Sequence, residues 1–312
     1  MIALNARAAA RPELGGVERW ARELAARLTA RVLAPPAALS HRAGQVWEQA
    51  ALPVLARRAE VLLNPANLAP LAFPRNVVVI HDAAVLRSPE WYSPAYVRWQ
   101  RLVLPRIARG ALRVVTVSAF SRDELASLLG LQAVIVPGGV DHARFVPGPA
   151  RTDRPYVLTV ASRTARKNLG ALAETARRLA GDGIELVAVG GDRPQFTGER
   201  LPVRSLGHVP DDELPALYAG AAAFVLPSLY EGFGLPCLEA MACGTPVVAS
   251  DTTALPETCG DAALLVDPTD QVAIAEAVLC AVGNEDLAAR GLRRASEFSW
   301  DRTVAELTAA LP

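Results

Sequence analysis

The stretch "PSLYEGFGLPCLEAMACGTPVVAS" (residues 227–250) decides the fold class. It starts at the end of an apolar run typical of a buried strand, passes through the glycine-rich turn 232–235, and enters a short segment with helical spacing. Pro236 suits the first helical position, where its missing N–H is no loss, and Gly244 suits the C-terminal cap. A second β-branched run follows at once. The stretch therefore predicts a strand, a turn, a helix and another strand, in that order.

The same alternation of strand and helix extends along most of the chain. Apolar, β-branched runs predict strands at 77–82, 113–118, 133–139, 156–162, 185–191, 222–228, 245–250 and 262–267. Helical spacing predicts helices at 16–31, 121–130, 169–183, 210–221 and 236–244. Because strands that alternate with helices form parallel sheets covered on both faces, we expect an α/β protein. Two such sets of elements predict two doubly wound domains that face each other across a ligand cleft.

The chain length and one proline-rich segment predict the domain boundaries. The 312 residues suit two domains of about 150 residues each. Residues 148–155, within "FVPGPARTDRP", concentrate proline and charge, and we interpret them as the linker. The first domain then covers 1–147 and the second 156–298. The helical tail 299–312 either completes the first domain or packs on the second.

Charge is distributed unevenly, although the net charge is zero. Residues 1–150 carry 18 basic and 10 acidic residues, a balance of +8, and residues 151–312 carry 14 and 22, a balance of −8. This asymmetry indicates either an anionic partner or attraction between the two domains. The basic, aromatic-bearing segment 92–113 predicts either peripheral contact with the inner face of a membrane or an ordinary exposed helix. We expect no nucleic-acid partner.

The N-terminus and the cysteines argue against other classes of protein. The first residues lack a long apolar core and are interrupted by Arg7 and Arg11, so we expect no signal peptide or membrane span, and a cytoplasmic protein. The cysteines have neither CxxC spacing nor nearby histidine pairs, so we expect buried hydrophobic side chains rather than a zinc site or disulfides. They are Cys237, Cys243, Cys259 and Cys280.

The glycine-rich turn and two glutamates form a candidate binding site. The turn leaves the backbone N–H groups of Phe233, Gly234 and Leu235 free at a helix N-terminus, which favours an anion or a hydroxyl ligand. Glu231 precedes the turn and Glu239 lies in the helix, and both carboxylates can accept hydrogen bonds from sugar or ribose hydroxyls. The alternative is that both glutamates only cap the helix.

The motif "YEGFGLPCLEAMACGTPVVAS" resembles the signature of the retaining nucleotide-sugar glycosyltransferases of family 4, the glycosyl transferases group 1, in its mannosyltransferase-like subgroup. Similar motifs occur along nearly the whole chain, among them "LGGVERWARELA", "VVIHDAAVLRSPEWYSP", "VPGGVDHARFVPG", "SRTARKNL" and "LGHVPDDELPALYAGA". The resemblance implies the GT-B fold of two facing Rossmann-like domains, the first binding the acceptor and the second the donor. It also implies that no metal or other cofactor is needed, in accord with the absence of a DxD motif.

The resemblance assigns catalytic roles to individual residues. Lys167, the only lysine in the chain, would hold the donor diphosphate together with a nearby arginine, because a leaving group that gains negative charge is stabilised by positioned cations. Family members often have that arginine where Ser162 stands here, and Arg163 is our preferred substitute over Arg166. The alternative for Lys167 is a solvated cation at a helix end.

Other positions match family residues that bind the donor. Glu231 would hold hydroxyls of the donor sugar, Glu239 the ribose, and His81 would reach the sugar from the first domain, unless His81 is a hydrogen-bonded core histidine. The remaining predicted donor-binding residues line the phosphate, the sugar or the base. They are Gly15, Gly16, Arg166, Gly190, Val209, Phe233, Gly234 and Leu235.

Together these features predict an enzyme that moves a sugar from a nucleoside diphosphate to an acceptor hydroxyl with retention of configuration. The acceptor is expected to be a sugar, a lipid-linked sugar or a small molecule, as in polysaccharide biosynthesis, and GDP-mannose is the preferred donor. Two alternatives remain at this stage. One is a sugar-nucleotide epimerase with the same fold, and the other is a non-catalytic nucleotide-sugar-binding subunit.

Overall fold

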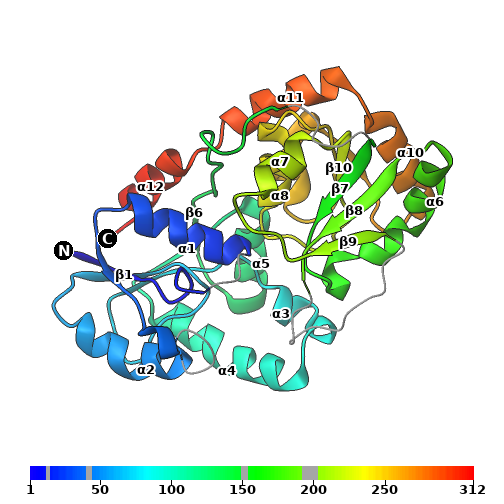
Figure 1. Cartoon of the computed structure of the whole chain (residues 1–312). Helices are drawn as coiled ribbons and strands as arrows, with labels where there is room; N and C mark the ends of the chain where they lie inside the picture. The colour runs from blue at the N-terminus through cyan, green and yellow to red at the C-terminus, as the bar shows by residue number, and fades with distance from the viewer. Residues whose placement is uncertain (12–14, 40–43, 149–153, 192–202) are drawn as a thin grey trace. The chain divides into compact units, whose positions relative to one another are not determined.

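The structure is a computed structural model that describes residues 1–11, 15–39, 44–148, 154–191 and 203–312. The chain divides into two compact units (Figure 1). The first contains Met1–Arg87, Pro94–Gly139 and Trp300–Pro312, and the second contains Ser88–Ser93 and Val140–Ser299.

These limits differ from the predicted domain boundaries. The two units separate at Gly139 and Val140 rather than after residue 147, and Ser88–Ser93 is assigned to the second unit. Most of the predicted linker 148–155 lies outside the described residues. The C-terminal tail, whose placement the sequence left open, lies in the first unit.

The first unit is built on one parallel sheet with the strand order β2-β1-β3-β4-β5-β6. Its strands are β1 (Ile2–Asn5), β2 (Arg31–Leu33), β3 (Val61–Asn64), β4 (Asn76–Val79), β5 (Arg113–Thr116) and β6 (Ala133–Ile135). Its α-helices are α1 (Gly16–Arg27), α2 (Gly44–Leu55), α3 (Ala84–Arg87), α4 (Pro94–Gly110), α5 (Ala119–Leu129) and α12 (Trp300–Ala309). From β1 the chain first adds β2 on one side and then β3 and the later strands on the other, so the switch point of the sheet lies between β1 and β3. Ligands of α/β sheets bind at such a point, at the carboxyl ends of the strands.

The C-terminal helix α12 belongs to the core of the first unit. Trp300 is 2% exposed, and its ring lies edge-on to that of Trp20 on α1, with 6.2 Å between the centroids. Arg113 at the start of β5 donates a 2.7 Å hydrogen bond to the carbonyl oxygen of Ala310. Burial of two tryptophans removes a large apolar area from water, so we expect α12 to contribute strongly to the stability of this unit.

The second unit has the strand order β12-β11-β10-β7-β8-β9, again all parallel. Its strands are β7 (Tyr156–Val160), β8 (Glu185–Val189), β9 (Arg204–Gly207), β10 (Ala223–Leu226), β11 (Val247–Ser250) and β12 (Ala263–Val266). Its α-helices are α6 (Ala173–Gly181), α7 (Leu214–Ala219), α8 (Leu235–Ala242), α9 (Leu255–Cys259), α10 (Gln271–Ala281) and α11 (Glu285–Ser296). In chain order this is the Rossmann arrangement 3-2-1-4-5-6, whose switch point lies between the adjacent strands β7 and β10.

Helices cover both faces of the second sheet (Figure 1). Helix α6 packs against α10 on one side, and α8 packs against α11 on the other. Strands β10 and β11 are buried along their whole length. This explains why their sequences are continuous apolar runs instead of alternating patterns.

All strands predicted from the sequence are present, as β4, β5, β6, β7, β8, β10, β11 and β12. The sequence analysis missed β1, β2, β3 and β9. Each of these has only three or four residues, and β9 is an exposed edge strand without an apolar run. Among the described residues, no helix is long and apolar enough to cross a membrane.

The cysteines agree with the prediction at three of four positions. Cys237, Cys243 and Cys259 are buried and free, but Cys280 is exposed, which corrects the expectation for that residue. Cys280 lies near the end of α10, on the side of the helix that faces solvent.

Candidate functional site

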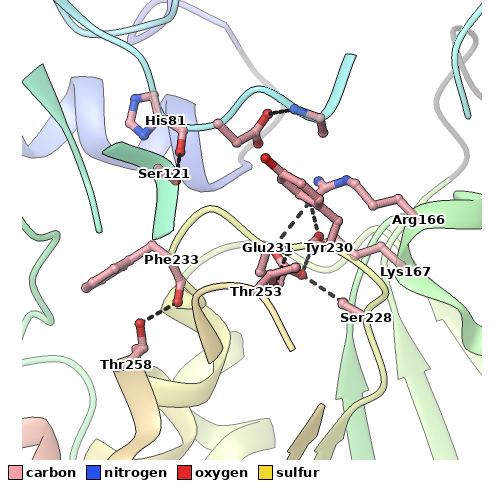
Figure 2. Close-up of polar contacts among 12 residues, drawn as sticks. His81, Ser121, Arg166, Lys167, Ser228, Tyr230, Glu231, Phe233, Thr253 and Thr258 are labelled. Carbon is pink, nitrogen blue, oxygen red and sulfur yellow. Dashed lines mark hydrogen bonds and ion pairs between the residues drawn. The ribbon is translucent and has the colours of Figure 1, made fainter. Parts of the chain in front are cut away.

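The two strands at the switch point of the second unit bring Lys167 and Glu231 together. The chain leaves β7 at Val160 and enters a single 3-10 turn, Ala165–Lys167, while it leaves β10 at Leu226 and passes through Ser228 to Glu231. Because β7 and β10 are neighbours, residues 64 apart in the sequence meet at one sheet edge. The Nζ of Lys167 donates a hydrogen bond to the Oε1 of Glu231, and both side chains are about nine-tenths buried (Figure 2).

Three side chains hold the carboxylate of Glu231 in place. Ser228 Oγ donates to Oε1 over 2.8 Å in addition to the bond from Lys167. Arg166 Nη1 lies 3.4 Å from Oε2 and also donates over 2.8 Å to the carbonyl oxygen of Tyr230. Figure 2 shows these groups gathered around the carboxylate. Charge-assisted hydrogen bonds of this kind fix a carboxylate strongly.

The electrostatics of the pair favour a charged Glu231. Burial raises the pKa of Glu231, but the opposing effects of the Lys167 and Arg166 cations are larger in sum, so its pKa lies below the ordinary value. Burial lowers the pKa of Lys167, and the Glu231 carboxylate counteracts this only in part. Two cations beside one carboxylate leave a local excess of positive charge, which is a suitable environment for an anionic ligand.

Arg166, rather than Arg163, contacts the Glu231 carboxylate beside Lys167. The side chain of Arg163 donates instead to Ser205 Oγ at β9, three strands from β10 in the sheet. The 3-10 turn at Ala165–Lys167 directs Arg166 toward the Glu231 loop, where the backbone N–H of Leu229 also donates to the carbonyl of Arg166 over 2.9 Å. The geometry therefore does not favour our preference for Arg163 as the partner of Lys167.

The glycine-rich turn lies where the sequence predicted it. Gly234 has φ +107°, and a Cβ there would lie 2.7 Å from a side-chain carbon of Leu255, so glycine is required. Helix α8 begins at Leu235 and its N-cap residue makes no side-chain cap. In its first turn Pro236 has no N–H, and the N–H of Cys237 donates to the carbonyl of Gly234 over 3.0 Å. Phe233 is nearly buried and its carbonyl accepts a 2.6 Å bond from Thr258.

Glu239, Gly190 and Val209, three further residues predicted to bind the donor, all lie in the second unit. Glu239 is 4% exposed, and its Oε2 accepts a 3.0 Å hydrogen bond from the hydroxyl of Tyr218, a contact that the sequence analysis did not foresee. Gly190 follows β8 and has φ +137°, and a Cβ there would lie 2.0 Å from the carbonyl oxygen of Ala161. Val209 follows β9 and is half-buried. The ligand roles of these residues stay predictions.

Sequence reasoning missed Thr253, which holds the backbone of Glu231. Its Oγ1 accepts a 3.1 Å hydrogen bond from the N–H of Glu231, and the N–H of Ala254 lies 3.4 Å from the carbonyl of Glu231 (Figure 2). Thr253 has φ +60°, a conformation that β-branched residues rarely adopt. Such strain persists only where surrounding structure enforces it, and it concentrates at functional sites.

In the first unit, Gly15 and Gly16 precede and begin α1, after the carboxyl end of β1. The N–H of Gly15 donates to Glu18 Oε2 over 3.1 Å, so a capping carboxylate already occupies this helix N-terminus. Glu18 is in turn paired with Arg11 over 3.0 Å. The predicted binding role of the two glycines stays a prediction.

His81 follows β4 and is held within the first unit. The ring Nε2 of His81 lies 2.7 Å from the carbonyl oxygen of Pro65, and the ring lies edge-on to Trp20. The backbone N–H of His81 donates to Asn67 Oδ1. Burial lowers the pKa of His81, which favours the neutral imidazole. The Nε2 atom then carries the proton, and Nδ1 is the remaining acceptor. Among the described residues, no group of three metal-ligating side chains is found.

Comparisons with known proteins agree with this geometry. Residues 154–284 match the family model described as Glycosyl transferases group 1. The O-antigen chain mannosyltransferase B of Escherichia coli is 34% identical, over 78% of this chain and 71% of that protein. The MMP alpha-(1->4)-mannosyltransferase of Mycolicibacterium hassiacum is 33% identical, over 78% of this chain and 66% of that protein.

Solved structures show the same fold at lower identity. A sucrose-phosphate synthase from Thermosynechococcus elongatus has a TM-score of 0.78 at 22% identity, covering 99% of this chain and 97% of that chain. Anabaena HepE, solved in complex with UDP-glucose, has a TM-score of 0.78 at 18% identity, covering 99% and 98%. The fold of two Rossmann-like units is GT-B, as predicted. The chain belongs to the glycosyl transferases group 1 family, and it is a glycosyltransferase.

Proposed function

We propose that the protein transfers a hexose from a nucleoside-diphosphate sugar to an acceptor hydroxyl, with retention of anomeric configuration and without a metal ion. The observation that carries this proposal is the cluster of Lys167, Arg166 and Glu231 at the switch point of the second unit. Two cations and a helix N-terminus at one sheet edge suit a diphosphate, and a buried, charged carboxylate suits sugar hydroxyls.

The proposed mechanism gives each of these side chains a task. When the donor binds, Lys167 exchanges part of its contact with Glu231 for the diphosphate, and Glu231 then accepts hydrogen bonds from hydroxyls of the sugar. As the sugar–phosphate bond breaks, Lys167 and Arg166 stabilise the growing negative charge. The departing phosphate accepts the proton of the acceptor hydroxyl, which attacks from the same face. Metal independence is proposed because the two cations can supply this stabilisation.

GDP-mannose is the proposed donor. Several relatives are named as mannosyltransferases, and one at 37% identity over 57% of this chain, from Mycolicibacterium smegmatis, is named GDP-mannose-dependent. The proposed acceptor is a saccharide or a glycolipid. The first unit is the proposed acceptor-binding part, and Glu239 is the proposed ribose ligand of the second.

A donor panel tests this function. The native protein should be stabilised against thermal unfolding by its own donor among GDP-mannose, UDP-glucose, ADP-glucose and dTDP-glucose, because a ligand of the native state raises its stability. With that donor and a mannoside acceptor, NMR of the product should show the same anomeric configuration as the donor, at a rate unchanged by EDTA. An inverted product, or an isomerised donor without acceptor, would contradict the proposal.

We also propose that helix α4 of the first unit contacts a membrane surface. Arg98, Arg101, Arg106 and Arg109 are exposed on this helix, and none of them forms an ion pair within the part of the chain that the structure describes. Leu102 on the same helix is 54% exposed. A basic face with an exposed apolar side chain suits the inner, anionic surface of a membrane.

Sedimentation with lipid vesicles tests this contact. The protein should bind vesicles that contain phosphatidylserine but not pure phosphatidylcholine, and Arg98→Gln with Arg101→Gln should weaken binding by about 2 kcal/mol, since each basic residue near such a surface contributes about 1 kcal/mol. Arg57→Gln with Arg58→Gln, exposed in the same unit, is the control of equal charge. Equal loss in both pairs would show that net charge, not α4, is responsible.

Thr253 should contribute to turnover by placing Glu231. Thr253→Gly relieves the positive φ but removes the hydroxyl, so we expect unchanged or higher thermal stability with kcat lowered about tenfold. Thr253→Ser keeps the hydroxyl and should retain most of the activity. Unfolding temperature and kcat are measured for both variants. A glycine variant with full kcat would show that the hydroxyl does not position the carboxylate.

A further inference from the structure

The carboxyl end of β1 carries a buried arginine with two side-chain nitrogens that lack a hydrogen-bond partner in the described part of the chain. Arg7 follows the strand by two residues and is 3% exposed. Its Nε lies 3.1 Å from Glu48 Oε1, within ion-pair distance, but without the geometry of a hydrogen bond. Its Nη1 is also buried and has no hydrogen-bond partner among the residues that the structure describes. A buried guanidinium normally has its donors filled, so this one calls for a further acceptor.

The groups around Glu48 are already committed to one another. Asn5 Nδ2 donates to Glu48 Oε1 over 2.7 Å and to Asn64 Oδ1 over 3.0 Å. Asn64 in turn donates to Asn76 Oδ1 over 3.0 Å, and Asn76 donates to backbone carbonyls. This network runs across β1, β3 and β4 and is nine-tenths or more buried throughout. The network fixes the position of Glu48, and its described contacts provide no acceptor for Nη1 of Arg7.

Polar groups on other elements lie close to Arg7. Burial raises the pKa of Tyr96 on α4, with a further contribution from Asp82, while the charges of Arg11 and Arg7 act in the opposite direction. All three charges are therefore near the phenol. Tyr96 accepts a 2.9 Å hydrogen bond from Gln100. Arg11 is paired with Glu18, but its side chain is 36% exposed.

We propose that Arg7, assisted by Arg11, binds an oxyanion of the acceptor substrate, a phosphate or a carboxylate. The location supports this, because the switch point between β1 and β3 is where this sheet is expected to bind a ligand. The chemistry supports it as well, because a guanidinium binds both oxyanions through paired N–H groups. The charge balance of +8 over residues 1–150 favours an anionic ligand in the same way.

The inference rests on the proposed function in one respect, namely that the first unit binds the acceptor. It adds a property that the reaction class leaves open: the acceptor is an anionic sugar or lipid headgroup rather than a neutral saccharide. Arg7 then selects the substrate by contact with a group that does not react, and a neutral acceptor would leave its donors unfilled.

Binding of inorganic phosphate and of acetate to Lys167→Ala protein tests the site, because this background weakens phosphate binding at the donor site. Calorimetry should detect binding of at least one of the two anions. Binding of phosphate only would identify the acceptor group as a phosphate, and binding of acetate only would identify it as a carboxylate. Arg7→Gln should weaken binding about tenfold or more, Arg11→Gln less, and Arg58→Gln, which removes an exposed charge of the same unit, not at all.

Two variants guard against a trivial loss of the fold. If Arg7→Gln unfolds because Glu48 loses its partner, the pair Arg7→Met with Glu48→Gln removes both charges together. Arg11→Gln changes a more exposed side chain and is expected to fold in any case. Binding of neither anion, or equal affinity in the parent and in every folded variant of Arg7 and Arg11, overturns the inference.

Steady-state kinetics separate this inference from the proposed function. Arg7→Gln should lower kcat/KM about tenfold or more for an acceptor that carries a phosphate or carboxylate, while hydrolysis of the donor in the absence of acceptor stays unchanged. Equal loss for charged and neutral acceptors would assign Arg7 a structural role only. Absence of donor turnover in the unaltered protein would instead overturn the proposed function.

Discussion

Replacement of Lys167 by Ala is expected to lower kcat by about 10²- to 10³-fold, the range seen when one preorganised group is removed from a developing anion. Lys167 is held at the switch point between β7 and β10, and its ammonium is mostly buried beside Glu231. A buried cation interacts with a departing phosphate more strongly than an exposed one, because less water screens the charge. The measurement is single-turnover release of nucleoside diphosphate.

A matched control separates this effect from a general loss of charge. Arg177→Ala removes a cation of α6 in the same unit, where the side chain is 70% exposed and paired with Glu174. That variant should retain kcat within about twofold, as most exposed substitutions away from a site do. If Lys167→Ala matched it, Lys167 would have no part in the chemical step.

Replacement of Glu231 by Gln is expected to impair both stability and turnover. The variant leaves the buried Lys167 and Arg166 without their carboxylate, and breaking a buried pair typically lowers the free energy of unfolding by about 3–5 kcal/mol. Lysine can lose its proton, so the lower end of this range is expected. Loss of a charged hydrogen bond to the sugar should also lower kcat/KM by about 10²-fold. Urea unfolding and steady-state kinetics measure the two effects.

The stability difference between native protein and Glu231→Gln should depend on pH. The pKa of Glu231 in the folded state lies below its ordinary value of 4.5, so the folded state binds this proton less tightly than the unfolded chain. Its stabilising contribution is therefore complete above about pH 4.5 and declines as the pH falls through the folded-state pKa. Urea unfolding at pH 7 and at pH 4 should show a smaller difference at the lower pH.

A double-mutant cycle identifies the source of this loss. Combined with Lys167→Met, Glu231→Gln should cost less than the sum of the two single changes, because the double variant no longer leaves either Lys167 or Glu231 charged without the other. Strict additivity would mean that the contact of Lys167 with Glu231 contributes nothing to stability.

The fold class could be predicted because residues close together in the sequence determine most of its strands, turns and helices. The turn at 232–235, Pro236 at the start of α8 and Gly244 after its end each act within a few residues, and the structure has the strand, turn, helix and strand in the predicted order. Strands β1, β2, β3 and β9 escaped prediction, and their length is not the reason, because the predicted strands β4, β5 and β6 also have only three or four residues. Their existence depends on pairing with neighbouring strands.

The identity of the candidate site residues was also within reach of the sequence, but their contacts were not. Lys167 and Glu231 were expected to hold different parts of the donor, and only the order of strands in the sheet shows that they pair with each other. The direction of Arg166 depends on one 3-10 turn, which composition and spacing do not reveal. Thr253 gave no sequence signal, because its importance lies in its backbone conformation.

Calorimetric titration of nucleoside diphosphate into the native protein and three variants tests the central claim most directly, that Lys167 and Glu231 form the donor diphosphate and sugar site. GDP should bind the native protein and the Arg177→Ala control with equal affinity, and Lys167→Ala should weaken binding at least about tenfold, as expected for a charge-assisted contact. Glu231→Gln should bind GDP as well as the native protein does but bind the intact sugar nucleotide more weakly. Unchanged GDP affinity in Lys167→Ala would contradict the account.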